Sequence, residues 1–308
     1  MRHEALLYRS DQEFLDTALP FLHEGLDTGE FVMVNTSEHN RALLTAALGN
    51  RGIAYEPLAD QAHHPARTLT AFVRILDRAV AGGGRGVRAI TEVARGKDAA
   101  ECAAWARYEA AVNVVLSRYP VSALCPYDLR SASAASLDGA ERTHPSLHTA
   151  DARYVNSKFE DPADYLRRSM TETPPDPLTA TDPVLTAGDV TDLAVVRDEV
   201  YLATLDTKLP GDTVDDFVFA VSEVLTNALQ HGDAPVRLRL WQSPTQLVCE
   251  VIDQGPGIEN PFTGYTPPPQ AHSTDGAIGL WMAHQLCDSV TWRRDETGSF
   301  CVTLTVRA

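Results

Sequence analysis

Glu223-Val-Leu-Thr-Asn227-Ala-Leu-Gln-His231 is the stretch that decides the fold of the second half of this chain. On a helix, Glu223 and Asn227 stand four residues apart, so their side chains project from one face. An amide oxygen is a hard ligand suited to Mg²⁺, which takes its other ligands from phosphates and water. A carboxylate one turn away can accept a proton from a hydroxyl that attacks a phosphate. The pair therefore predicts a helix that carries a magnesium ligand and a general base.

A glycine turn follows this helix after one intervening strand. The apolar run 247–252 ends in Asp253-Gln-Gly255-Pro-Gly257. A carboxylate at a strand end can accept a hydrogen bond from the amino group of adenine, and losing such a partner costs about 1–3 kcal/mol. Gly255 and Gly257 let the backbone turn and approach a ligand closely. Asp253 is therefore the candidate for adenine recognition.

A second glycine pair, Gly276-Ala-Ile-Gly279, opens an apolar helix. The free N–H groups at such a helix start can face phosphate oxygens. Taken singly, these motifs are weak, because a Glu/Asn pair is usually solvated surface and Asp-x-Gly-x-Gly is usually an ordinary turn. Their order and spacing together predict a nucleotide site. Residues 261–275, rich in proline, are predicted to form a lid over the phosphates.

Length and composition favour two soluble domains. The chain has 308 residues, of which 44% are hydrophobic and 22% charged, values typical of folded domains. It contains no apolar run of membrane-spanning length and its first residues lack a secretory signal, so we expect a cytoplasmic protein without membrane contact. Five scattered cysteines, never at CxxC spacing, fit a reduced compartment and predict no structural zinc.

Negative charge is concentrated in the second half. Residues 171–308 hold 7 Lys+Arg and 20 Asp+Glu, a balance of −13, whereas residues 1–170 have a balance of −3. This distribution can serve solubility alone, or it can favour a basic protein partner. Direct nucleic-acid binding is not expected, because no basic patch is present to meet phosphates.

A proline-rich stretch divides the chain. Residues 171–183 contain four prolines and predict an extended linker between a domain at 1–170 and a domain at 184–308. The first domain alternates strand-like and helix-like segments, which predicts an α/β fold with a mostly parallel sheet covered by helices. Its expected strands are 4–8, 31–34, 87–90 and 121–125, and its expected helices begin near Ser10 and Ser37 and span 69–81 and 99–119.

The second domain is predicted to be α+β, with helices on one face of a mixed sheet. Two helices, 190–204 and 214–231, precede a hairpin of strands 236–241 and 246–252. A helix at 278–288 and a second hairpin, 289–294 with 300–306, complete the domain.

The first domain resembles the MEDS domain, a sensory module of bacterial regulators. The resemblance rests on the start His3-Glu-Ala-Leu-Leu-Tyr8, on Pro20-Phe-Leu, Gly25-Leu and Gly29-Glu30, and on Leu124-Cys-Pro-Tyr-Asp128 followed by Thr143-His-Pro145. The resemblance implies an α/β, RecA-like sheet and the sensing of a ligand or a protein, and it supplies no catalytic residues.

The cysteine and histidines of this domain leave one alternative open. Cys125, His144 and Asp128 have the composition of a hydrolytic triad. A cysteine at the end of an apolar strand is more often a buried, inert thiol. His3, His63 and His64 are expected in surface or core roles rather than as metal ligands.

The second domain resembles the GHKL (Bergerat-fold) ATPases, and most closely their RsbW-type anti-sigma factor kinases. The matching motifs are Phe219-Ala-Val-Ser-Glu223 with Asn227, and Gly279-Leu-Trp-Met-Ala283. The resemblance implies ATP and Mg²⁺ as cofactors, Asn227 as the Mg²⁺ ligand and Glu223 as the base. It further implies Asp253 at adenine, Gly255, Gly257, Gly276 and Gly279 around the phosphates, and Ser299 beside the adenine.

That resemblance also implies partners. It predicts serine/threonine kinase activity on a STAS-type anti-sigma factor antagonist, sequestration of a sigma factor, with Arg197 as a candidate contact, and a homodimer. Two alternatives stay open: a catalytically silent partner-binding module, and a sensor histidine kinase fragment. A silent binding module should show no change when Glu223 is replaced by alanine. A sensor histidine kinase needs a phosphoacceptor histidine on a helical hairpin before the ATPase domain.

Overall fold

The computed structural model describes residues 1–49, 51–55, 64–92, 96, 98–265 and 277–308. The chain forms two compact units, Met1–Leu166 and Arg167–Ala308. Each unit has its own sheet and its own hydrophobic core.

The first unit is built on a seven-stranded sheet of order β3-β2-β4-β5-β1-β6-β7. All neighbouring strands are parallel except β6 and β7. This confirms the predicted mostly parallel α/β domain. The strands are β1 (Arg2–Tyr8), β2 (Phe31–Asn35), β3 (Ile53–Tyr55), β4 (Val87–Thr91), β5 (Val121–Asp128), β6 (Ser146–His148) and β7 (Arg153–Val155).

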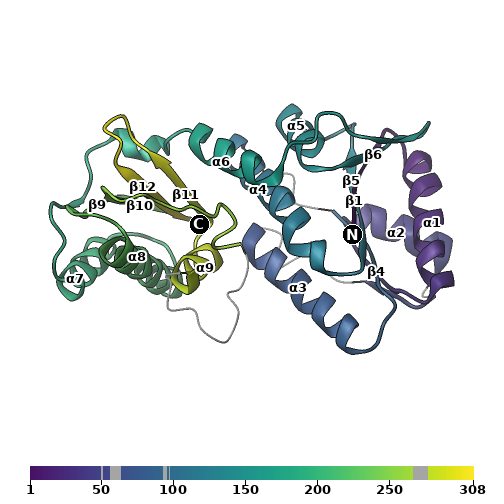
Figure 1. Ribbon diagram of the computed structural model, residues 1–308, viewed down its shortest axis with the longest axis horizontal. Coiled ribbons are helices and arrows are strands. Elements are labelled where there is room, and N and C mark those ends of the chain that lie inside the picture. The colour runs from purple at the N-terminus through teal and green to yellow at the C-terminus, as the bar shows by residue number, and fades with distance from the viewer. Residues whose placement is uncertain (50, 56–63, 93–95, 97, 266–276) are drawn as a thin grey trace. The chain divides into compact units, whose positions relative to one another are not determined.

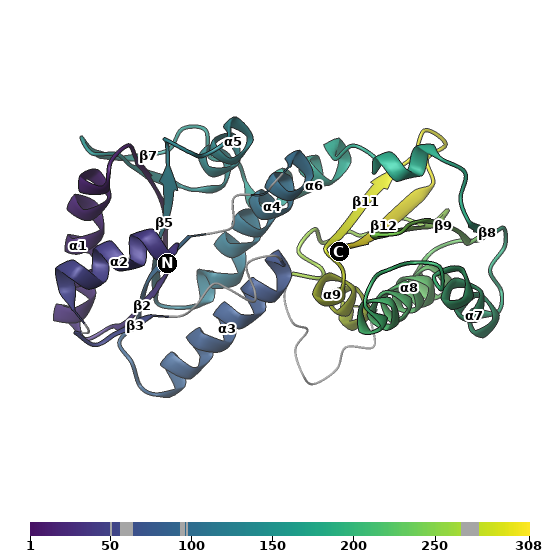
Figure 2. The same cartoon turned by 180° about the vertical axis from the view of Figure 1, so that it is seen from behind.

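Helices cover both faces of this sheet, with α1 and α2 on one face and α3 and α4 on the other (Figures 1 and 2). Two N-caps predicted from sequence are present, since the hydroxyls of Ser10 and Ser37 accept backbone N–H groups at the start of α1 and α2. The helices are α1 (Asp11–Thr28), α2 (Glu38–Leu48), α3 (Pro65–Ala81), α4 (Ala99–Val115), α5 (Ala134–Thr143) and α6 (Pro162–Glu172), with a 3₁₀ turn, η1 (Leu116–Arg118), after α4.

Alternation along β1 assigns its side chains to the two faces. Leu6 and Tyr8 join the core beneath α1 and α2, while Ala5 packs in the small cluster with Cys125 and Ala140 of α5. Because Ala5 pairs with Cys125 in the parallel register, His3 and Cys125 point to the α4–α5 face. Buried residues of both faces make this strand almost continuously buried.

The second unit has a five-stranded antiparallel sheet of order β11-β12-β10-β9-β8, with α7, α8 and α9 on one face (Figure 1). This confirms the predicted GHKL-like α+β layering, including both hairpins, but the sheet is antiparallel rather than mixed, because β12 joins the two hairpins by pairing with β10 in the antiparallel direction. The elements are β8 (Leu185–Ala187), α7 (Leu193–Ala203), α8 (Gly211–His231), β9 (Arg237–Ser243), β10 (Gln246–Asp253), α9 (Ala277–Leu286), β11 (Ser289–Arg294) and β12 (Phe300–Arg307).

The proline-rich segment makes specific contacts with this second sheet. It contains a 3₁₀ turn, η2 (Pro177–Ala180). The Asp176 carboxylate accepts hydrogen bonds from Arg307 and Gln246, and the carbonyl of Thr181 accepts one from the indole of Trp241. Part of the segment predicted as a linker therefore packs against the sheet of the second unit.

Candidate functional site

Helices α8 and α9 bring the predicted base and magnesium ligand together. Glu223 and Asn227 lie on the face of α8 that meets the first turn of α9. A Cβ built on Gly279 would come within 2.6 Å of Glu223 Oε2 and 3.4 Å of Asn227 Nδ2. Only a glycine leaves room for both polar side chains at this point. Neither side chain is buried completely, so both remain accessible to a ligand.

The Asp253 carboxylate closes β10 and lies against two glycines. It is 5% exposed, and its Oδ1 accepts a hydrogen bond of 2.7 Å from the N–H of Gly255. A Cβ on Gly232, the residue that follows α8, would lie 2.6 Å from the carboxylate carbon, and one on Gly255 would lie 2.9 Å from Oδ1. The chain therefore requires small residues on both sides of this carboxylate, next to the end of the helix that carries Glu223.

Burial changes the acidity of Asp253. Desolvation raises the pKa of this carboxyl above its ordinary value, although backbone hydrogen bonds from Gly255 and Asp233 oppose the shift. A buried acceptor with an elevated pKa is typical of a carboxyl group placed for ligand recognition rather than for stability.

Gly257 and Ser299 lie beside Asp253, but in different roles. Gly257 has φ +81°, and a Cβ there would meet the ring of Phe300 at 2.6 Å; both the backbone and the space thus require glycine. Phe300 pairs with Asp253 in the sheet, which places Ser299 next to the carboxylate. The buried hydroxyl of Ser299 already bonds with Gln254 at 2.8 Å and Thr297 at 2.9 Å.

Arg294 is a residue of this site that the sequence did not reveal. Its guanidinium, at the end of β11, donates hydrogen bonds to the carbonyls of Gly255, Pro256 and Gly298. It thereby joins the glycine turn after β10 to the turn before β12. No motif marked Arg294, because the contact depends on the pairing of strands distant in sequence.

The predicted lid is only partly described. Gly276 and residues 266–275 lie outside the described residues. In the part that precedes them, Gly264 has φ +94° and packs against the ring of His284 on α9, and Tyr265 is buried with its ring 5.0 Å from that imidazole. The described start of the segment is therefore anchored to α9 through Gly264 and Tyr265.

The residues present fit the nucleotide and cation that this fold uses. Glu223, Asn227 and Asp253 offer oxygen atoms, Gly279 opens the start of α9, and close packing at Gly232, Gly255 and Gly257 would exclude any larger side chain. Helix N-termini bind phosphate oxygens, and amide and carboxylate oxygens suit Mg²⁺. The arrangement can therefore hold a purine through Asp253 and direct its phosphates toward α9.

The hydrolytic triad considered for the first unit is wrong. Both oxygens of Asp128 accept hydrogen bonds from Arg130. His144 instead directs Nδ1 at the carbonyl of Ala140. Burial raises the pKa of the Cys125 thiol well above its ordinary value, so the thiol is not an activated nucleophile, and Asp128 does not orient His144 as the third member of a triad would.

Comparison with known families agrees with both halves of this architecture. Residues 2–145 match the model of the MEDS family, the MEthanogen/methylotroph, DcmR Sensory domain. Residues 186–306 match the model of the histidine kinase-like ATPase domain. The chain therefore carries an N-terminal MEDS sensory domain and a C-terminal, GHKL-like ATPase domain. No curated protein matches the chain.

Among the described residues, no helix is both long enough and apolar enough to cross a membrane.

Proposed function

We propose that this protein is an anti-sigma regulatory factor of the RsbW type. In this proposal, the second domain binds ATP and Mg²⁺ and phosphorylates a serine or threonine of a STAS-type antagonist. It also sequesters a sigma factor. The observation that supports the proposal best is the packing of Gly279 against Glu223 and Asn227, because it brings a carboxylate and an amide side chain to the start of α9, where a base and a Mg²⁺ ligand are needed.

Each residue then has a defined task. Asn227 supplies a cation ligand, and Asp253 accepts the adenine amino group. Glu223 accepts the proton of the attacking hydroxyl, which suits phosphoryl transfer, where positioning and charge neutralisation provide most of the catalysis. ATP supplies the phosphoryl group when bound. Gly255, Gly257 and Gly279 let the backbone approach the nucleotide.

The segment before the ATPase domain argues against a sensor histidine kinase. Residues 149–230 contain no histidine. That stretch holds α6, η2, β8, α7 and most of α8, rather than a helical hairpin with a phosphoacceptor histidine. A serine or threonine on a separate protein is therefore the better acceptor.

A partner surface is available on α7 and α8. Several large apolar side chains are exposed there, among acidic residues: Val195, Tyr201, Leu202, Leu205 and Phe219. Exposed apolar groups within a negative rim suit a basic protein partner, which agrees with the sigma factor in our proposal. Arg197 on α7 has a side chain that is 57% exposed, and its guanidinium lies 4.0 Å from the carboxylate of Asp198.

The MEDS domain would tune this activity by sensing a ligand or a protein. Deletion of residues 1–170 tests this step, because regulation in cells should change while ATP binding by the remaining domain persists. Unchanged regulation would contradict it. A homodimer is proposed on the family resemblance alone, and sedimentation of the full chain measures it.

Glu223→Gln tests kinase activity. We expect ATP affinity to stay within about two-fold, because Glu223 acts on the acceptor hydroxyl, whereas phosphate transfer to a STAS substrate should fall about 100-fold or more. Asp215→Asn, an exposed acidic residue on the same helix, is the matched control and should leave both quantities unchanged. Wild-type protein that binds ATP but transfers no phosphate to any STAS substrate would instead identify a catalytically silent binding module.

A further inference from the structure

The α4–α5 face of the first sheet contains a buried group of four side chains with no role in the ATPase site. They are His3 on β1, Glu109 on α4, Cys125 on β5 and His144, which directly follows α5. Each is at most 2% exposed. One ligand-type atom from each lies within 4.8 Å of the others. Two imidazoles, a carboxylate and a thiol therefore converge in the interior of the MEDS domain.

The hydrogen bonds of His3 fix which ring nitrogen carries a lone pair. Asn113 donates through Nδ2 to the carbonyls of Glu109 and Thr143. Its Oδ1 must therefore accept from His3 Nδ1, at 3.0 Å. In the neutral ring, Nε2 of His3 is then the unprotonated nitrogen. That atom lies 3.0 Å from Glu109 Oε2 and 3.5 Å from Cys125 Sγ.

His144 is oriented in the same way. Its Nδ1 lies 2.9 Å from the carbonyl of Ala140, which can only accept a hydrogen bond. Nε2 of His144 is consequently unprotonated in the neutral ring. Among the described residues it has no hydrogen-bond partner, and it lies 3.7 Å from Glu109 Oε2. Backbone and amide contacts behind a histidine are the arrangement that orients metal-binding imidazoles.

Two nitrogen lone pairs and a carboxylate thus face one another in a dry interior. Glu109 Oε1 has no hydrogen-bond partner in the part of the chain that the structure describes. In the described part of the chain, no lysine or arginine forms an ion pair with Glu109; only His3 and His144 approach it. Burying a carboxylate without a cation is costly. A positive charge between these four groups would satisfy all of them.

We propose that His3, Glu109, Cys125 and His144 bind a divalent cation of the zinc class. Zinc takes four ligands of these types in a tetrahedron, with bonds of about 2.0–2.3 Å, so neighbouring ligand atoms stand about 3.3–3.8 Å apart. Three observed separations are 3.0, 3.5 and 3.7 Å and all the pairs lie within 4.8 Å, so side-chain adjustments of about 1 Å or less bring the four atoms to tetrahedral spacing. Cations that prefer sulfur ligands alone or oxygen ligands alone fit less well, because these four ligands combine one sulfur with nitrogen and oxygen.

Four protein ligands leave no open position for a substrate, so the site is structural or sensory rather than catalytic. The cation joins strands β1 and β5 to helix α4 and to the end of α5. Loading and removal of the metal then change the stability of the sensory domain as one unit. CxxC spacing is absent because the ligands come from four separate elements, which explains why the sequence predicted no zinc.

Metal analysis of the full-length protein tests this proposal. After dialysis against limiting Zn²⁺, we expect one tightly bound equivalent and a rise in the melting temperature of the first domain. X-ray absorption of that zinc protein should show one sulfur and three nitrogen or oxygen neighbours. This measurement uses the wild type and so does not depend on variant folding. A spectrum with several sulfur neighbours would assign the metal to other cysteines and would overturn the proposal. Protein that retains no zinc would also overturn it, because a proton shared among the four side chains would then supply the positive charge.

Variants provide the second test. Co²⁺ bound in place of Zn²⁺ should give a sulfur charge-transfer band that Cys125→Ser removes and His144→Gln weakens. Cys102→Ser is the control, because Cys102 is buried in the same domain and contacts Gly96 and Ser133 instead. Equal metal binding by wild type, Cys125→Ser and His144→Gln would contradict the assignment.

Discussion

Gly279 on α9 lies so close to Glu223 on α8 that a Cβ in its place would come within 2.6 Å of the Glu223 carboxylate oxygen. The two residues are 56 positions apart, and their motifs were predicted independently. Their contact means that the start of α9 and the polar face of α8 cannot be altered separately.

Gly279→Ala should therefore impair the nucleotide site. The added methyl group forces Glu223 and α9 apart, and a displacement of this size lowers turnover by about 10- to 100-fold. Phosphate transfer and ATP titration measure the effect. Gly211→Ala is the matched control, since Gly211 starts α8 with no atom within 4 Å of its Cβ position and should behave as wild type. Equal activity of the two variants would show that the contact is irrelevant to function.

Asp253→Asn should separate ligand binding from stability. Oδ1 of the asparagine can still accept the N–H of Gly255, so the amide nitrogen takes the other position and meets the adenine amino group donor to donor. We expect ATP affinity to fall about 10- to 100-fold. Burial raises the pKa of Asp253, so the ionised carboxylate destabilises the folded state above that pKa. The neutral asparagine removes this destabilisation, and the variant should therefore melt no lower than wild type at pH 7. A lower melting temperature with unchanged ATP affinity would contradict both parts.

Local sequence patterns predicted the elements of this protein well. The caps at Ser10 and Ser37, the hairpins of the second sheet and the parallel first sheet depend on neighbouring residues and on alternation. The three-residue strands β3, β6, β7 and β8 were missed because so short a strand carries no periodic signal, and the helices α5 and α6 were not predicted either.

Contacts between distant elements could not be predicted. Cys125 contacts His3 across 122 positions of the sequence, and His3 contacts Glu109 across 106. Both contacts depend on the order of the strands in the folded sheet. The same holds for Arg294, whose contact with Gly255 depends on the turns that two hairpins place side by side.

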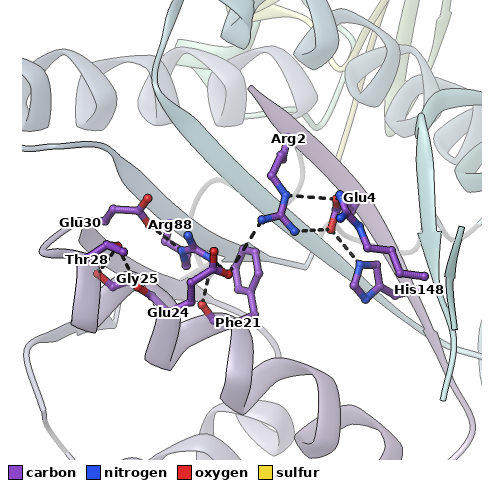
Figure 3. Close-up of polar contacts among 10 residues, drawn as sticks. Arg2, Glu4, Phe21, Glu24, Gly25, Thr28, Glu30, Arg88 and His148 are labelled. Carbon is purple, nitrogen blue, oxygen red and sulfur yellow. Dashed lines mark hydrogen bonds and ion pairs between the residues drawn. The ribbon is translucent and has the colours of Figure 1, made fainter. Parts of the chain in front are cut away.

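Arg88 explains part of the MEDS-type sequence pattern. This arginine on β4 is 3% exposed and donates hydrogen bonds to Glu30 and Glu24 at 2.6 Å each, and to the carbonyl of Phe21 (Figure 3). A Cβ on Gly25 would lie 2.7 Å from Arg88 Cδ. Phe21, Gly25 and Glu30 thus share one function, which is to enclose a buried guanidinium.

Gly25→Ala should destabilise the first domain by about 1–3 kcal/mol, because Arg88 is held by three partners and cannot move aside. Chemical unfolding of the full chain measures the change. In an Arg88→Ala background the contacts with Arg88 Cδ and Nε disappear and only the contact with Cβ, at 3.0 Å, remains, so the same substitution should cost clearly less than it does in the wild-type background. A penalty of equal size in both backgrounds would show that Arg88 is not its cause.

Glu4 gives a prediction for acid stability. Its carboxylate accepts hydrogen bonds from Arg2 and Arg153 and lies 2.9 Å from His148 Nε2 (Figure 3). Burial alone would raise the pKa of Glu4, but the hydrogen bonds from His148, Arg2 and Arg153 outweigh it and lower the pKa from 4.5 to about 2. The folded state therefore holds the ionised form more strongly than the unfolded chain does. This stabilisation is complete above pH 4.5 and disappears as the pH falls from 4.5 to 2.

Glu4→Gln should remove that contribution. The shift corresponds to about 3 kcal/mol at most, and solvent screening at the half-exposed Arg2 and Arg153 reduces it to about 1–2 kcal/mol. At pH 7 the variant should accordingly unfold at lower denaturant than wild type, and the difference should vanish near pH 2. Exposed Glu38→Gln is the control and should follow the wild-type curve. A difference between Glu4→Gln and wild type that stays constant from pH 7 to pH 2 would show that Glu4 contributes through packing rather than through its charge.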